Sequence, residues 1–373
     1  MKFVVERDSL VDAVNWVARS LSSRPIQTSL LGILLEVDKE IALTGSDSET
    51  TTKAHIEAQI SQGGEVLVPG RLLAEIVRSL PAKPITFQLD GSRVLVTAGS
   101  AKFTLPTLPV NEYPTLPSIP PVTGHLPAEV FAEAISQVVV AAGRDDSLPN
   151  LTGVHVEITN NAITLAATDR YRLAVKEINW SAKIPNFETT TLLRARTLSD
   201  AERALAGSAD VEIAWSSPES KERLVGFISD EKTMTTRIMD GTLPPFRHLF
   251  PKDVTSEAIV DVAALLDAVH RVAIVTDKTV PLRLSFADNS LQLEAGAGND
   301  AQATEVLEIQ FSGPEINIAF NPTFLTDGLN ALGTNFVHFG FTAGNKPAVM
   351  MGKNEIAGAP NESFKYLLMP MRF

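Results

Sequence analysis

A pair of strands with apolar residues at every second position occurs three times along the chain. In each copy a short polar turn interrupts the alternation, which then resumes, and this is the pattern of a half-buried β-hairpin. The turns lie at residues 38–40, 159–162 and 287–290. A pattern that recurs at long, similar intervals marks an internal repeat, so we expect three copies of one unit. The alternating apolar positions are Ile33, Leu35, Val37, Ile41 and Leu43, then Val154, Val156, Ile158, Ile163 and Leu165, then Leu282, Leu284, Phe286, Leu291 and Leu293.

Segments with helical spacing stand before and after each hairpin. The leading segments have apolar residues three or four positions apart, as amphipathic helices require, and Asp8 or Ser9 is available to cap the first one. The trailing helices are expected over 69–78, from 194 onward and from 321 onward, where Asn-Pro gives a favourable start. The apolar positions of the leading helices are Leu10, Val14, Val17 and Leu21, then Phe131, Ile135 and Val138, then Leu265, Val269 and Val272.

Further alternating strands close each copy, for example over 85–89, 211–215 and 337–341. Each copy therefore has two helices on one side of an antiparallel sheet, and the predicted fold class is α+β with three repeated domains. Pro-rich joints separate the copies, with Pro at positions 114, 117, 120 and 121 and again at 244, 245 and 251. Repetition alone is equally consistent with triplication of a unit that carries no functional message. The predicted domains are 1–122, 123–252 and 253–373.

The composition is that of a folded protein in a reducing compartment. With 373 residues, 44% hydrophobic and 20% charged, the chain is long enough for two or three domains. The absence of cysteine excludes disulfides and thiolate metal sites and fits the cytoplasm. The acidic start of the chain does not resemble a signal peptide, and the sequence has no apolar run of the roughly 18 residues that a membrane span needs.

Charge and motif content limit the function classes. The chain has 32 basic and 44 acidic residues and a net charge of −12, which by itself argues against nucleic acid, although basic residues can still gather on one surface. The six histidines are too far apart for a helical two-histidine metal motif, and no Gly-x-Ser-x-Gly sequence occurs. Asp47 and Asp169 are predicted to be turn residues rather than catalytic acids. We therefore expect no catalysis, no metal and no cofactor.

Four segments together resemble the family of bacterial DNA polymerase III beta subunits, the sliding clamps. The resemblance covers the whole chain in three-domain order. The segments are Met1-Lys2-Phe3 with Ser23-Arg24-Pro25, the stretch from Leu151-Thr152-Gly153-Val154 to Ala167-Thr168-Asp169-Arg170-Tyr171-Arg172-Leu173-Ala174, the stretch Gly241-Thr242-Leu243-Pro244-Pro245-Phe246-Arg247 with Pro251, and the end Tyr366-Leu367-Leu368-Met369-Pro370-Met371-Arg372-Phe373.

The resemblance implies a DNA-clamp fold and a non-enzymatic processivity factor. In this family two chains join head to tail, and six similar domains form a closed ring around duplex DNA with the helices lining the hole. The implied partners are a second copy of the chain, double-stranded DNA, the catalytic subunit of the replicative polymerase, the clamp loader and other proteins with clamp-binding motifs, and no membrane. The alternatives are a duplicate clamp specialised for repair or inhibitor tolerance and, less favoured, a repeat-built enzyme with its site at a domain junction.

The resemblance also implies three kinds of site. For each arginine below, a solvated surface charge is the alternative, and for each interface residue an ordinary core position. The DNA contacts would be Arg24, Arg71, Arg78, Arg196 and Arg203. The dimer interface would bring Phe103 and Leu105 against Ile274 and Val275 of a second copy. The partner-peptide groove between domains two and three would comprise Leu151, Thr168, Arg170, Tyr171, Arg172, Leu173, Pro244, Leu249, Val349, Met369, Pro370, Met371 and Arg372.

Three positions depart from the family pattern near the expected groove. Arg170 and Tyr171 stand where the family commonly has Gly and His, and Pro245 stands where it commonly has an acid. Because these residues surround the expected peptide site, we expect the departures to alter partner preference rather than the fold.

Overall fold

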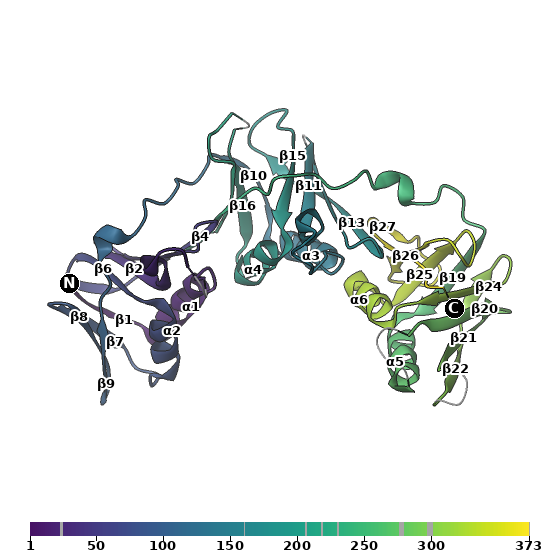
Figure 1. The fold of residues 1–373 in the computed structure, drawn as a ribbon, viewed down its shortest axis with the longest axis horizontal. Coiled ribbons are helices and arrows are strands. Elements are labelled where there is room, and N and C mark those ends of the chain that lie inside the picture. The colour runs from purple at the N-terminus through teal and green to yellow at the C-terminus, as the bar shows by residue number, and fades with distance from the viewer. Residues whose placement is uncertain are drawn as a thin grey trace. The chain divides into compact units, whose positions relative to one another are not determined.

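The computed structural model describes residues 1–22, 25–159, 161–205, 207–217, 219–229, 231–275, 280–296 and 301–372. The chain forms two compact units, and Figure 1 labels many of their helices and strands. Unit 1 contains Met1–Ala132, Ser181–Pro185 and Asp200–Ile238, and unit 2 contains Glu133–Trp180, Asn186–Ser199 and Met239–Phe373. None of the helices within the described ranges combines the length and apolarity that crossing a bilayer requires.

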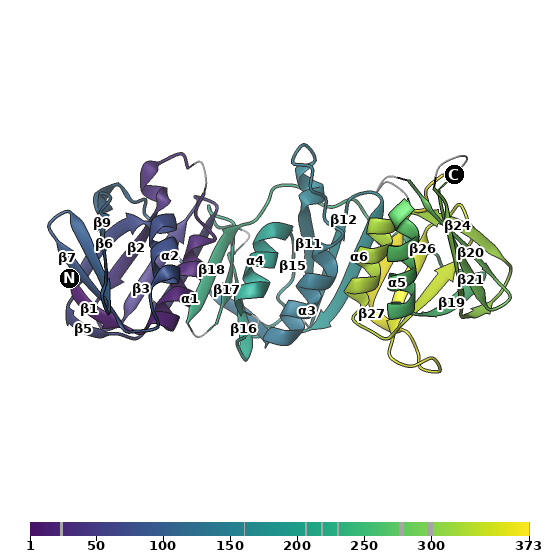
Figure 2. The same cartoon turned by 90° about the horizontal axis from the view of Figure 1, so that it is seen from below.

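Unit 1 is built on two antiparallel sheets. The larger has the order β14-β10-β16-β17-β18-β4-β3-β2-β6, and the smaller has the order β5-β1-β7-β8-β9. Helices α1 (Arg7–Ala18) and α2 (Gly70–Ser79) lie side by side against strands of the larger sheet (Figure 2). The strands are β1 (Lys2–Val5), β2 (Gly32–Val37), β3 (Ile41–Ser46), β4 (Thr50–Ile56), β5 (Gln59–Gln62), β6 (Gly64–Pro69), β7 (Ile85–Asp90), β8 (Arg93–Ala98), β9 (Ala101–Pro106), β10 (Val122–Pro127), β14 (Ser181–Ala182), β16 (Asp210–Trp215), β17 (Leu224–Ile228) and β18 (Lys232–Arg237).

Unit 2 repeats this plan. Its larger sheet has the order β15-β11-β12-β13-β27-β26-β25-β19-β23, and its smaller sheet has the order β22-β21-β20-β24. Helices α5 (Val262–Val272) and α6 (Pro322–Leu332) lie side by side in it (Figure 2). The strands are β11 (Gly153–Thr159), β12 (Ala162–Thr168), β13 (Arg172–Asn179), β15 (Thr189–Arg194), β19 (Ser256–Asp261), β20 (Leu282–Ala287), β21 (Ser290–Ala295), β22 (Ala303–Glu308), β23 (Gln310–Ser312), β24 (Ile316–Phe320), β25 (Phe336–Phe341), β26 (Ala348–Lys353) and β27 (Asn361–Leu368).

The three predicted hairpins are confirmed, and each closes in the register that buries its apolar face. The buried cross-strand pairs are Leu35 with Leu43, Val156 with Leu165, and Leu284 with Leu293. The second copy also has two helices, α3 (Ala128–Val139) and α4 (Ala195–Leu205). These elements confirm the α+β class and the threefold repetition, whereas the domain boundaries near 122 and 252 stay predictions.

The predicted helix starts are confirmed where a polar side chain can reach the first backbone N–H groups. The side chain of Asn321 accepts hydrogen bonds from Thr323 N (2.9 Å) and Phe324 N (3.2 Å), which caps α6. That helix ends at Gly333, whose φ of 63° is the left-handed conformation that glycine adopts without strain.

The predicted cap and length of the first helix are wrong. Helix α1 begins at Arg7, so Asp8 and Ser9 lie inside it, and its N-terminus has no side-chain cap. It ends at Ala18, before the predicted position Leu21. Ser20 Oγ donates a hydrogen bond to Val17 O at 2.9 Å, which satisfies a carbonyl that a longer helix would have used. Leu21 is nevertheless buried, so its apolar spacing reflects burial rather than helix.

Asp47 and Asp169 are turn residues, as predicted. Each carboxylate accepts hydrogen bonds from two backbone N–H groups of its own turn, which is the Asx-turn arrangement. The hairpins β3–β4 and β12–β13 are joined in this way.

Candidate functional site

The candidate groove in unit 2 has an apolar floor made by four neighbouring strands. Thr168 of β12 pairs with Leu173 of β13, and Leu173 pairs in turn with Leu367 of β27. Leu367 also pairs with Val349 of β26. Because paired residues point to the same face of a sheet, these side chains stand in one row. Three of the predicted groove residues are therefore neighbours in space although they are far apart in sequence.

The linker over residues 239–255 packs on this floor. Leu243 and Phe246 are its buried anchors, while Pro244 and Leu249 are exposed beside them. At Gly241 the φ is 104° and an added Cβ would lie 2.4 Å from Asn150, so the turn that starts the linker requires glycine. The buried cluster that joins linker and floor is Ala166, Leu173, Leu243, Phe246, Val349 and Leu367, with Leu151, Val175, Phe250 and Met351 packed against it.

The corner between β12 and β13 is rigid. Asp169 Oδ1 accepts from the backbone N–H groups of Tyr171 (3.0 Å) and Arg172 (3.1 Å), and Thr168 Oγ1 donates to Arg172 O (2.6 Å). Arg170 has a φ of 82°, a conformation that favours glycine. This explains in backbone terms why glycine is the residue expected from the resemblance at that position. Tyr171 projects from the corner and is 56% exposed.

Arg172 is buried and holds the corner to helix α6. Its guanidinium donates to Asp169 Oδ2 (2.9 Å) and Asp327 Oδ2 (2.6 Å) and lies 4.3 Å from the ring centroid of Phe324. Burial opposes its charge, but the Tyr366 hydroxyl and the two carboxylates outweigh that effect and hold the pKa of Arg172 above its usual value. Arg172 therefore positions the groove wall rather than offering a free charge to a ligand.

The chain end forms the open wall of the groove. Met369 N donates to Tyr171 O at 2.9 Å, and Met371 N donates to Ala319 O at 2.8 Å, so the segment is tied to the corner and to β24. Met369 is exposed, and Pro370 and Met371 are half-buried. Arg372 is exposed. Two methionines and a proline thus present an adaptable apolar edge.

A pocket of about 310 Å³ adjoins this corner. Tyr171 and Phe324 stack at its rim with ring centroids 6.1 Å apart, and Leu148 and Leu151 contribute apolar surface. Arg172 forms part of its wall. The pocket is large enough for one bulky side chain, and its apolar walls with a charged edge suit an aromatic or leucine anchor.

His155 lies behind the linker with its ring against Phe246, at a centroid distance of 5.7 Å. Burial lowers the pKa of His155, and Arg247 adds to this effect while Glu157 opposes it. Burial therefore favours the neutral imidazole, which packs against the linker through Phe246.

Several residues of this site were absent from the prediction. Leu367 was available from the sequence, because the strand that ends at Leu368 alternates and Leu367 points to the same face as Met369. Phe324, Leu243 and Phe246 carry no comparable signal, since their role depends on how a helix start and a linker fold over the sheet.

The candidate DNA contacts lie on two helices. Arg71 and Arg78 are exposed on α2, and Arg196 and Arg203 are exposed on α4. None of the four has a carboxylate within 4.0 Å among the described residues, so their charges are not neutralised by an ion pair there. Arg24 lies outside the described residues.

The candidate interface residues lie at or near the free edges of the two smaller sheets. Phe103 is exposed on edge strand β9, whereas Leu105 of the same strand is 0% exposed and packs inside unit 1. Ile274 is 80% exposed and Val275 half-buried, just after α5. Val306, which the prediction missed, is 59% exposed on edge strand β22. Exposed apolar residues on unpaired edge strands are typical of strand-to-strand contacts.

The fold defines a protein built from repeated α+β units, and comparison with known proteins assigns it to a family. Three family models match in succession: the N-terminal domain of the DNA polymerase III beta subunit over residues 1–117, its central domain over 125–245 and its C-terminal domain over 247–372. The chain therefore belongs to the DNA polymerase III beta subunit family, the bacterial DNA sliding clamps, whose members are processivity factors.

Individual relatives agree with this assignment. The beta sliding clamp of Streptomyces coelicolor is 46% identical over 373 residues, which cover 100% of this chain and 99% of that protein. The beta sliding clamp homolog GriR of Streptomyces muensis is 40% identical, with full coverage of both. The solved sliding clamp of Pseudomonas aeruginosa bound to griselimycin superposes with a TM-score of 0.91 at 26% identity, again with full coverage of both chains. The resemblance and the sliding-clamp function predicted from it are confirmed, and the duplicate-clamp and enzyme alternatives are not favoured.

Proposed function

We propose that the protein works as a replicative sliding clamp: two chains close into a ring around duplex DNA, and the unit 2 groove holds a peptide of the polymerase. The observation that carries this proposal is the groove itself. Its buried apolar floor is complete, yet Tyr171 and Met369, which a backbone hydrogen bond joins, remain exposed beside it. A contiguous apolar edge of this kind marks a site for a partner.

The chemistry of the groove supports a short peptide with leucine or aromatic anchors. Each fully buried anchor of this size contributes about 1.5–3 kcal/mol, so two such anchors supply about 3–6 kcal/mol of the roughly 8 kcal/mol that micromolar binding requires. The hydrogen bonds that tie Met369 and Met371 to their neighbours hold the wall in place before a peptide arrives. Partners with this chemistry include the polymerase catalytic subunit, the clamp loader and other clamp-motif proteins.

The free edges of the smaller sheets support the ring. Strand β9 of one chain pairing with β22 of another would extend both sheets and cover Phe103, Val306 and Ile274. Such a contact joins two different surfaces, and a rotation that closes after two copies gives a ring without free ends.

The exposed arginines of α2 and α4 support weak contacts to the DNA backbone. A closed ring is retained by topology, so individual contacts can be weak and a net charge of −12 is no obstacle. We also infer that the protein has no catalytic centre of its own. Within the described residues no group of three or more acidic or histidine side chains is arranged to hold a metal ion, and the acids around Arg172 are occupied by it.

The decisive experiment is loading onto a nicked circular plasmid. The protein should remain on the circle at high salt and leave when the circle is cut, because a ring slides off a free end. Binding through phosphate contacts would instead fall steeply with salt on both substrates. Equal release from circular and linear DNA would contradict the ring.

A double substitution provides the matched control. Ile274→Ala with Val275→Ala should yield a folded protein that sediments as a monomer and is not retained on the circle. The groove peptide should still bind it, since these residues lie outside the apolar cluster of the groove.

A further inference from the structure

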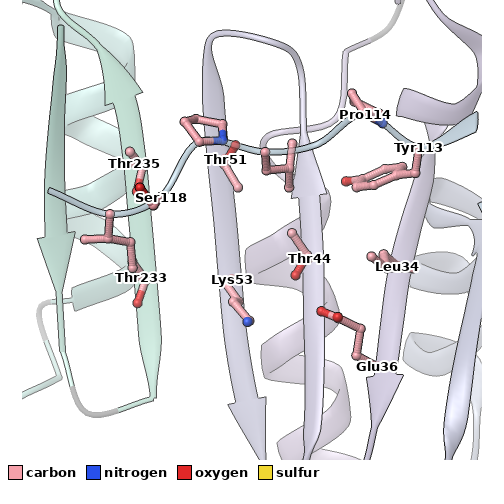
Figure 3. Close-up of a pocket in the computed structure, with 13 residues that line it drawn as sticks. Leu34, Glu36, Thr44, Thr51, Lys53, Tyr113, Pro114, Ser118, Thr233 and Thr235 are labelled. Carbon is pink, nitrogen blue, oxygen red and sulfur yellow. The ribbon is translucent and has the colours of Figure 1, made fainter. Parts of the chain in front are cut away.

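A second linker, residues 107–121, covers a pocket on unit 1. The pocket holds about 390 Å³ and lies between this linker and strands β2, β3, β4 and β18 (Figure 3). We call it the linker pocket; the side chains that define its chemistry are Glu36, Thr44, Thr51, Lys53, Tyr113 and Thr235.

Strand register shows that the linker pocket occupies the same place in its repeat as the groove does in unit 2. Thr44 pairs with Lys53 as Ala166 pairs with Val175. Thr51 pairs with Thr235 as Leu173 pairs with Leu367. The four unit 2 residues belong to the apolar floor of the groove, and all four unit 1 residues line the linker pocket. The same backbone positions therefore carry polar side chains in one unit and apolar side chains in the other.

The two linkers repeat as well. In unit 1 a 3-10 turn over Val110–Glu112 leads into Tyr113-Pro114, and in unit 2 a 3-10 turn over Arg247–Leu249 leads into Phe250-Pro251. Both linkers contain Thr-Leu-Pro near their start, at 107–109 and 242–244. An aromatic residue thus lies over the sheet in each unit, but only in unit 1 does it carry a hydroxyl.

The floor of the linker pocket carries two charges without ion pairs. In unit 2, Glu157 is paired with Arg247 of the linker at 2.7 Å. In unit 1, strand register makes Glu36 the counterpart of Glu157. The linker residue that corresponds to Arg247 is the uncharged Val110, so Glu36 has no such partner. Neither Glu36 nor Lys53 has an oppositely charged group within 4.0 Å among the described residues. Figure 3 shows the Lys53 and Glu36 side chains on either side of Thr44, with their charged ends below it in this view.

The inner wall of the pocket carries an unused hydrogen-bond donor. Tyr113 Oη is buried and has no hydrogen-bond partner within the described ranges. Burial, with a smaller contribution from Glu36, raises the pKa of Tyr113, so the hydroxyl stays protonated and needs an acceptor. The oxygen itself is buried, so this hydroxyl closes the wall of the pocket rather than opening into it.

We propose that the linker pocket binds the carboxamide side chain of a glutamine or asparagine in a partner peptide. The carboxamide oxygen accepts from Lys53 Nζ, while its NH₂ group donates to Glu36. A cationic ligand would be attracted by Glu36 but repelled by Lys53, and an anionic ligand would be attracted by Lys53 but repelled by Glu36. A neutral group that has both a hydrogen-bond donor and an acceptor can interact favourably with both side chains. Leu34, Leu116 and Ile119 contact the apolar neighbours of that side chain.

The choice of a peptide as the occupant rests on the proposed function, because it follows from equivalence with the groove. The chemistry of the pocket does not depend on that function. A failure of the carboxamide assignment therefore leaves the groove and the ring untouched, whereas a failure of the proposed function removes the reason for choosing a peptide and leaves the carboxamide chemistry to be tested.

The test uses the full-length protein with methyl-labelled leucine and isoleucine and three acetylated, N-methylamidated tripeptides: Leu-Gln-Leu, Leu-Arg-Leu and Leu-Met-Leu. The glutamine peptide should shift the methyl resonances of Leu34, Leu116 and Ile119 and bind about tenfold more tightly than the methionine peptide. Glu36→Gln and Lys53→Met should each remove most of that preference and leave binding of the methionine peptide unchanged. Lys39→Met is the control for Lys53→Met, since it changes the net charge by the same amount without lining the pocket.

Three outcomes would overturn the proposal. Tighter binding of the arginine peptide would make the pocket a cation site, and equal binding of all three peptides would reduce it to apolar contact. Shifts confined to Leu173 and Leu367 would place the glutamine peptide in the groove instead. Loss of polymerase-peptide binding in a chain lacking residues 369–373, with the shifts of Leu34 and Ile119 preserved, would separate the two sites.

Discussion

Two hairpin corners of the molecule, one in each unit, have the same backbone and different surroundings. In unit 1, Asp47 Oδ1 accepts from Glu49 N (3.0 Å) and Thr50 N (2.7 Å). In unit 2, Asp169 Oδ1 accepts from the corresponding groups of Tyr171 and Arg172 at 3.0 and 3.1 Å. The residue that follows each aspartate, Ser48 or Arg170, has a φ of 82°. The repeat is therefore conserved within this chain down to single hydrogen bonds.

The two corners have matching backbones, but their side chains differ in chemistry. The unit 2 corner adds Tyr171 and Arg172, which reach the ring of Phe324 and complete an apolar site. The unit 1 corner adds Glu49 and Thr50, beside a floor of threonines and a lysine. One fold thus supplies two linker-covered sites, and the chemistry of each is decided by a few side chains on shared positions.

The largest expected effect comes from removing residues 369–373, which deletes the open wall of the unit 2 groove. Binding of polymerase-type peptides should become undetectable, because the apolar contact of Met369 and Met371, roughly 1.5–3 kcal/mol each where fully buried, corresponds to more than a hundredfold in affinity. Fluorescence anisotropy measures the binding, and sedimentation should show that the dimer persists. Loss of the dimer would mean that the tail is structural, and unchanged affinity would place the groove elsewhere.

A smaller effect is expected from exchanging equivalent floor residues between the units. Val175→Lys puts a charge among apolar neighbours in the groove and should weaken peptide binding by at least about tenfold. The matched change Lys53→Val, at the equivalent position in unit 1, should leave that binding unchanged. Isothermal calorimetry with one polymerase-type peptide distinguishes the two variants. If both variants weaken binding equally, the two floors are not functionally distinct.

The sequence predicts the repeats well because hydrophobic alternation is local. The hairpins around Leu35, Val156 and Leu284 follow from a period of two, and the start of α6 follows from Asn321-Pro322. The groove is harder to predict from sequence, because it depends on a linker that crosses the sheet. Leu243 and Phe246 do not belong to a periodic apolar pattern, and Phe324 reaches the groove only because of where helix α6 begins. Resemblance supplied Leu173, Val349 and Met371 as a set, but only strand register shows that Leu173 and Val349 both flank Leu367. The first helix was predicted too long because Leu21 is buried without being helical.

The smallest expected effect tests the strain that both corners share. A non-glycine residue in the left-handed region destabilises the folded state by about 1–2 kcal/mol. Glycine removes that strain but costs about 0.5–1 kcal/mol, because it gives the unfolded chain more conformational entropy to lose on folding. Arg170→Gly should therefore stabilise unit 2 slightly, whereas Arg170→Ala keeps the strain and loses the contact of the guanidinium over the Tyr171 ring. Urea unfolding should rank glycine above alanine by about 0.5–1 kcal/mol, the reverse of the usual order. Ser48→Gly and Ser48→Ala in unit 1 should give the same ranking, because Ser48 has the same φ and a similar set of turn hydrogen bonds. If the alanine and glycine variants have equal unfolding free energies at Arg170 but not at Ser48, contacts with Tyr171 and Phe324 offset the backbone strain of the unit 2 corner. The two corners would then share a backbone geometry but differ in strain energy.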